Sequence, residues 1–152
     1  MRLELIQILS SFSGAIGFSM IFGLHGRQLP ISAVGAAFTW LVYLAVHWFG
    51  GDIFISALLA SVFGSIYVEV LARVIKVPKT VLLFSVLVSL IPGRDLYNTM
   101  RFAIDGAWPK FASSGLVTVQ YACAIALGIV IVQVLMQMLT RFGLIQRPAK
   151  KA

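Results

Sequence analysis

Four stretches of the chain run for about 20 residues with almost no charge, which is the length that an α-helix needs to cross a bilayer. They are residues 5–24, 31–49, 53–71 and 116–139. Charged residues make up 11% of the chain, whereas a soluble domain carries about 25%. So little charge cannot cover a water-facing surface. We therefore expect an all-α integral membrane protein.

The distribution of charge excludes a nucleic-acid-binding role. The net charge is +7, but the basic residues stand at the ends of the apolar segments, as membrane topology requires, and form no solvated patch. With 152 residues there is room for one domain. We expect a transmembrane helical domain over residues 1–140 and a basic cytoplasmic tail over residues 141–152.

A fifth apolar segment, residues 81–91, is too short to cross alone. At about 1.5 Å per residue it reaches roughly 17 Å of a ~30 Å hydrocarbon core. The pair Pro92-Gly93 ends it, and the polar residues Arg94, Asp95, Tyr97 and Asn98 follow. A complete crossing therefore needs a second half-helix after the break.

The positive-inside rule favours five crossings, with the N-terminus outside and the fourth helix short and broken at Pro92-Gly93. In that arrangement eight basic residues lie inside and four outside. The inner set is Arg27, Arg73, Lys76, Lys79, Arg141, Arg147, Lys150 and Lys151, and the outer set is Arg2, Arg94, Arg101 and Lys110. With four crossings the count reverses to five inside and seven outside.

The Pro-Gly break is the strongest candidate for a substrate site, and the residues that we expect to bind the substrate there are Pro92, Gly93, Arg94, Asp95, Tyr97 and Asn98. Proline removes an amide donor and glycine relaxes the backbone, so together they end a helix. Broken helices in secondary transporters present freed backbone groups and a half-helix N-terminus to the substrate. We expect the carbonyls of residues 88–91 and the amides near Asp95 and Leu96 to lack partners. The alternative is a re-entrant surface loop with no ligand.

Two further polar sets stand inside the apolar segments. Glu69 and Arg73 are four residues apart, which favours a structural ion pair, and a proton-coupling carboxylate at Glu69 is the alternative. Gln133, Gln137 and Thr140 share one face of the last helix, for interhelical hydrogen bonding or a pathway lining. No metal-ligand spacing or nucleophile–base pair is visible, so we expect no cofactor, no metal and no enzyme.

Small residues recur at spacings that let helix backbones approach closely. The pairs are Ser13 with Gly17, Ala57 with Ser61, Ala60 with Gly64, and Ser61 with Ser65. We expect packing within the chain. The alternative is a face for another subunit, including a second copy of this chain.

The stretch VPKTVLLFSVLVSLIPGRDLYNTM resembles the signature of the threonine/serine exporter family. That family has a Pro-x-Thr start, an apolar run, a terminal Pro-Gly and a tyrosine soon after, and this chain has Pro78, Thr80, Pro92, Gly93 and Tyr97 at those places. The stretch AIGFSMIFG resembles the family's first helix. Many members carry a second proline where this chain has Ser89, so we expect a straighter first half-helix.

The resemblance implies the small subunit of a two-component exporter in the bacterial cytoplasmic membrane, with a larger membrane subunit as its partner. Family substrates are threonine and serine, and split members are also linked with small dicarboxylates such as succinate. Arg94 and a half-helix N-terminus suit a carboxylate. Asp95 suits an ammonium group and repels a second carboxylate, which favours an amino acid. A membrane scaffold without transport activity is the remaining alternative.

Overall fold

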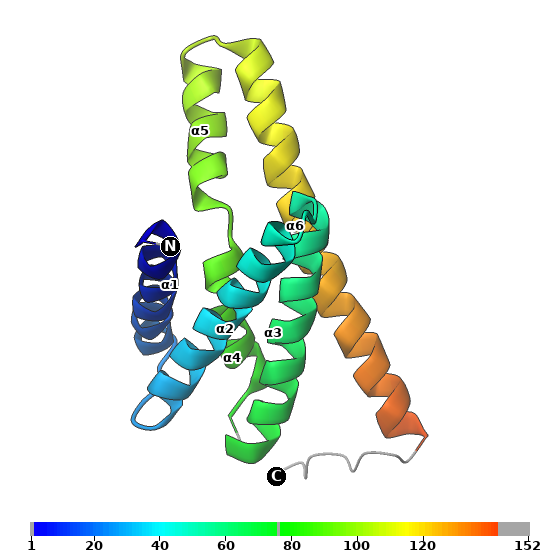
Figure 1. The fold of residues 1–152 in the computed structure, drawn as a ribbon. Helices are drawn as coiled ribbons and strands as arrows, with labels where there is room; N and C mark the ends of the chain where they lie inside the picture. The colour runs from blue at the N-terminus through cyan, green and yellow to red at the C-terminus, as the bar shows by residue number, and fades with distance from the viewer. Residues whose placement is uncertain (1, 76, 143–152) are drawn as a thin grey trace.

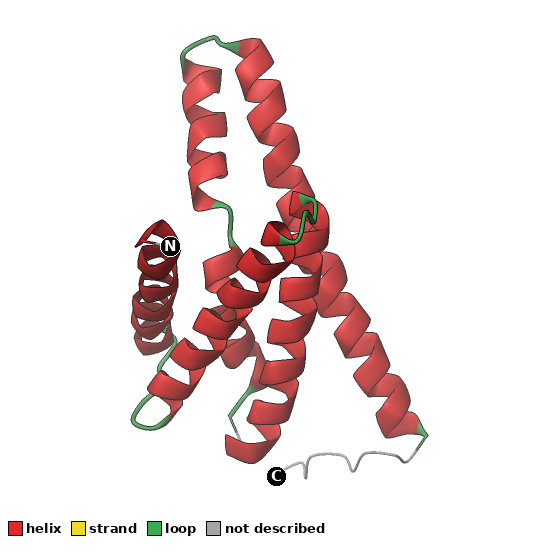
Figure 2. Ribbon diagram, in the orientation of Figure 1, coloured by secondary structure: helices red, strands yellow, loops and turns green. Residues whose placement is uncertain are grey.

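The computed structural model describes residues 2–75 and 77–142, and within them every regular element is a helix (Figure 2). The order is α1 Arg2–Ile21, α2 Gln28–Trp48, α3 Ile53–Ile75, α4 Lys79–Leu87, the 3₁₀ helix η1 Val88–Leu90, α5 Gly93–Ile104 and α6 Trp108–Arg141. The expected all-α membrane fold is confirmed.

The connections are short and alternate between two ends of the bundle (Figure 1). The α1–α2 and α3–α4 connections lie at one end, and the α2–α3 and α5–α6 connections lie at the other. Gly50 and Gly106, with φ of 85° and 68°, make the turns at the second end, a backbone region that side chains disfavour. This alternation agrees with the expected path of the chain, and which end faces the cytoplasm stays a prediction.

Three helices, α2, α3 and α6, are long and apolar enough to cross a membrane by themselves. The fourth candidate is the pair Lys79–Leu90 and Gly93–Ile104, which bends by 63° at the Pro-Gly break. The apolar part of α1, Ile6–Ile21, is shorter and reaches about 24 Å at 1.5 Å per residue. A broken fourth segment is thus present, and five full crossings stay a prediction.

Helix α6 is longer than its apolar segment suggested. It begins at Trp108 rather than near residue 116 and has 34 residues, about 51 Å of helix. Pro109, in its first turn, favours a helix start at that place. The first half of α6 pairs with α5 as a hairpin that extends beyond the rest of the bundle (Figure 1).

Small residues hold the centre of the bundle together. Ser61, on α3, donates to the carbonyl oxygen of Ala124 on α6 at 3.4 Å, and Gly64 fits against Thr39 and Leu87. Packing within the chain is therefore confirmed for these close-spaced residues. Ser13 and Gly17 are exposed on α1, so their role stays a prediction.

The proposed boundary between domain and tail falls inside the last helical turn, because Arg141 is the final residue of α6. Most of the expected basic tail, residues 143–152, lies outside the described residues. The division at residue 140 therefore stays a prediction.

Candidate functional site

The fourth segment loosens before it breaks. Helix α4 ends at Leu87, and η1 continues it as one 3₁₀ turn over Val88–Leu90. Ile91 then becomes extended, with φ of −64° and ψ of 123°, because the ring of Pro92 disfavours helical backbone in the preceding residue. Whether Ser89 makes this half-helix straighter than in members with a second proline stays a prediction.

The break satisfies more backbone groups than we expected. The Ile91 amide donates to the Val88 carbonyl at 3.2 Å, and the Gly93 amide donates to the Ile91 carbonyl at 2.8 Å. The Leu96 amide also has a partner, the Pro92 carbonyl at 2.9 Å. The expectation that this amide lacks a hydrogen-bond partner is therefore wrong. Within the described residues the Arg94 and Asp95 amides make no backbone hydrogen bond, as expected at a helix N-terminus.

A cavity of about 360 Å³ opens beside the break, and we call it the break cavity. It lies among α1, α2, α6 and the segment from η1 to the start of α5. Its lining is Gln7, Trp40, Tyr43, Leu44, His47, Leu90, Ile91, Pro92, Gly93, Arg94, Asp95 and Tyr121.

Four of the six substrate-binding residues expected from the sequence meet in this cavity: Pro92, Gly93, Arg94 and Asp95. Tyr97 and Asn98 lie outside its lining, and the Tyr97 side chain is 66% exposed on α5. These two side chains therefore stay candidates only for contacts outside the cavity of this chain.

An aromatic wall faces the break, and the sequence reading missed it. Trp40, Tyr43 and His47 stack along α2, with ring centroids 5.0 Å and 6.0 Å apart in succession. The Tyr43 and Tyr121 hydroxyls are hydrogen-bonded to each other, which ties α2 to α6. The spacing i, i+3, i+7 puts the three α2 residues on one helix face. That spacing was a usable signal, but nothing local indicated that the face meets Pro92-Gly93.

The break cavity combines the groups that a zwitterion requires. Arg94 supplies a cation at the start of α5, and the open amides and dipole of that helix also favour a carboxylate. Asp95 supplies the only acid in the lining. The Trp40 and Tyr43 rings add faces that attract an ammonium group. A small molecule with one positive and one negative group therefore fits this chemistry.

Glu69 lies near the C-terminal end of α3, and its carboxylate pairs with two basic side chains. Its carboxylate accepts from Arg73 at 3.0 Å and from Lys79 at 3.3 Å. The expected ion pair with Arg73 is confirmed, and Lys79 additionally ties α3 to the first turn of α4. A small cavity of about 50 Å³ adjoins these residues, with Gln133 on its α6 side. A coupling role for Glu69 stays a prediction.

Comparison with known proteins identifies a family to which the chain is similar. Residues 7–135 match the family model described as "Threonine/Serine exporter, ThrE". The matched region contains α2 to α5, most of α6 and every residue that lines the break cavity. No curated protein and no solved structure matches the chain.

Proposed function

Because this chain belongs to the threonine/serine exporter family, we propose that it is the small subunit of a two-component exporter of threonine and serine. The break cavity is its substrate site. Membership makes the chain a multi-pass membrane transport protein of the exporter type. The proposal adds the amino-acid substrate, the two-component form and the cytoplasmic membrane of a bacterium.

The observation that supports this substrate is the pairing of Arg94 with Asp95 in one cavity. An amino acid presents a carboxylate to Arg94 and to the open amides of α5, and an ammonium group to Asp95 and the aromatic wall. A dicarboxylate such as succinate satisfies Arg94 equally well, but its second carboxylate meets Asp95. Two like charges at close range in a site of low dielectric repel strongly. The amino acid is therefore the favoured substrate.

The exposure of α5 supports a partner subunit. None of its residues is buried, and α6 is the only described helix against which it packs extensively. Leu96, Met100 and Ile104 form an outward apolar stripe on α5, with exposed fractions of 47%, 64% and 86%. We propose that a larger membrane subunit, rather than lipid, covers this stripe. Secondary transporters are typically built from two such repeated halves.

Replacing Arg94 with Ala tests the site. We expect the substrate concentration for half-maximal efflux to rise roughly tenfold or more, because a charge-assisted contact contributes about 1.5–3 kcal/mol. The measurement is efflux of labelled threonine from preloaded cells over a range of internal concentrations. Arg101→Ala is the matched control, since Arg101 lies on the same helix, outside the cavity lining, in an exposed pair with Asp105 at 3.6 Å. Equal effects of the two substitutions would place the carboxylate contact elsewhere.

A further inference from the structure

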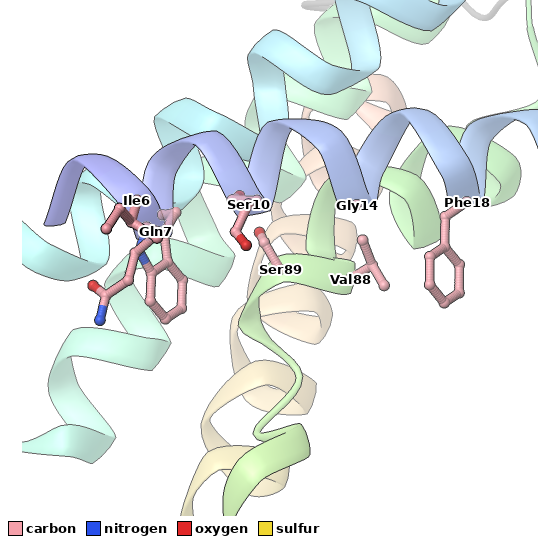
Figure 3. Close-up of a pocket in the computed structure, with 9 residues that line it drawn as sticks. Ile6, Gln7, Ser10, Gly14, Phe18, Val88 and Ser89 are labelled. Atoms are coloured by element: carbon pink, nitrogen blue, oxygen red, sulfur yellow. The ribbon is translucent and has the colours of Figure 1, made fainter. Parts of the chain in front are cut away.

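A second hollow, which we call the α1 groove, runs between α1 and the end of the broken helix (Figure 3). Its volume is about 350 Å³, at the lower end of the range for small-ligand pockets. Its lining is Ile6, Gln7, Ser10, Ser11, Gly14, Phe18, Trp40, Val88 and Ser89.

Helix α1 turns a polar face toward this groove. Gln7, Ser10, Ser11 and Gly14 follow the spacing i, i+3, i+4, i+7, which places them on one side of the helix. Figure 3 shows Ser10 of α1 and Ser89 of η1 directed toward one another across the groove. Hydroxyl groups from two separate elements therefore line the same groove.

Local hydrogen bonds orient the Ser89 hydroxyl. It donates to the Val86 carbonyl at 3.3 Å and lies 3.5 Å from the Ala36 carbonyl, which also accepts from Ser11 at 3.3 Å. A hydroxyl that donates its proton keeps lone pairs with which it accepts. The Ser89 hydroxyl is therefore held in place and can still accept a hydrogen bond.

The α1 groove adjoins the break cavity, because Gln7 and Trp40 line both. The two spaces differ in charge: the groove lining has no charged side chain, whereas the break cavity holds Arg94 and Asp95. The indole N–H of Trp40 is buried and has no hydrogen-bond partner among the described residues. Such orphaned buried donors are rare in folded proteins.

We propose that the α1 groove is the side-chain subsite of the exporter and selects substrates that carry a hydroxyl group. The inference rests on the proposed function, because Arg94 and Asp95 hold the charged head of the amino acid. The hydroxyl and methyl groups on its Cβ then face the end of the groove where Gln7 and Trp40 line both spaces. Ser10 and Ser89 exchange hydrogen bonds with its hydroxyl, and Val88 contacts the methyl group of threonine. A site built to bond a hydroxyl discriminates against an analogue without one.

The double substitution Ser10→Ala and Ser89→Ala tests the subsite. The gene in its native host is replaced by the variant, and efflux of preloaded labelled threonine is compared with efflux of labelled valine, which has a methyl group in place of the hydroxyl. We expect the threonine-to-valine efflux ratio to fall roughly tenfold, which is the size of effect that one or two lost hydrogen bonds produce. Rates are normalised to the amount of chain in the membrane.

Ser13→Ala and Ser85→Ala are the matched controls. Each removes one serine hydroxyl, Ser13 from α1 and Ser85 from α4 just before η1, and neither residue lines the groove. Both should keep the parental ratio. An unchanged ratio in the double variant, or an equal loss of both effluxes, overturns the subsite, because the head-group contacts are common to both amino acids. Failure of the parental chain to export threonine beyond a deletion strain overturns the proposed function itself, and the two failures are therefore distinguishable.

Discussion

Replacing Gly93 with Leu should abolish efflux and leave the chain inserted in the membrane. A Cβ atom built at Gly93 meets no other atom within 4 Å, and Gly93 lines the break cavity. A leucine side chain therefore projects into open space and occupies the volume that the substrate requires. It does so without a clash that would unfold the bundle. We expect threonine efflux to fall to the level of a deletion strain, measured in preloaded cells.

Gly17→Leu is the control for this substitution. A Cβ atom at Gly17 also meets nothing within 4 Å, and Gly17 lies on α1 outside the break cavity. It adds the same side chain to the chain without filling the proposed site. Parental efflux by Gly93→Leu, at an equal amount of protein in the membrane, would show that the break is only a turn.

Replacing Gly128 with Leu should destabilise the fold itself. A Cβ atom at Gly128 would lie 1.8 Å from the Ser61 hydroxyl oxygen and 3.1 Å from the Leu58 carbonyl oxygen. The second of these is backbone of α3, which cannot rotate away. Overpacking a tight contact costs about 1–3 kcal/mol, and occasionally more, and leucine adds four carbon atoms here. We expect the upper end of that range or beyond, seen as a lowered thermal unfolding midpoint in detergent.

Gly115→Leu is the comparison on the same helix. At Gly115 the nearest atom to an added Cβ is the Thr99 methyl at 3.6 Å, an ordinary contact. This variant should keep a midpoint closer to that of the parent. If Gly128→Leu unfolds at the parental temperature, α3 and α6 do not pack at Ser61 in the membrane, and the close-spaced small residues serve another purpose.

The helices could be predicted from the sequence because their signal is local. Uncharged runs about 20 residues long, with glycines between them, predict the ends of α2 and α3 to within a few residues. Pro92-Gly93 marks the break equally well, since proline acts on its own backbone and on the residue before it. The start of α6 was missed because residues 108–115 are weakly apolar, and the helix there is supported by its packing against α5.

The site could be predicted only in part. Pro92 to Asp95 are consecutive, so a local signal located them together. The aromatic wall comes from α2 and α6, and Gln7 comes from α1, which means that tertiary packing alone brings them to the break. Tyr97 was expected at the site by its closeness along the chain. In the structure its side chain is 66% exposed on α5 and lies outside the cavity lining.

Counterflow in vesicles that contain both subunits tests the proposed site and its substrate most directly. Vesicles are loaded with unlabelled threonine, and the uptake of labelled threonine, serine and succinate is followed with the parental chain and with Asp95→Asn. We expect counterflow of threonine and serine but not of succinate, and none in vesicles that lack the larger subunit. Asp95→Asn should slow the counterflow of threonine and serine and should allow counterflow of succinate. Counterflow of succinate but not of threonine with the parental chain would contradict the assignment of the break cavity to a zwitterionic amino acid.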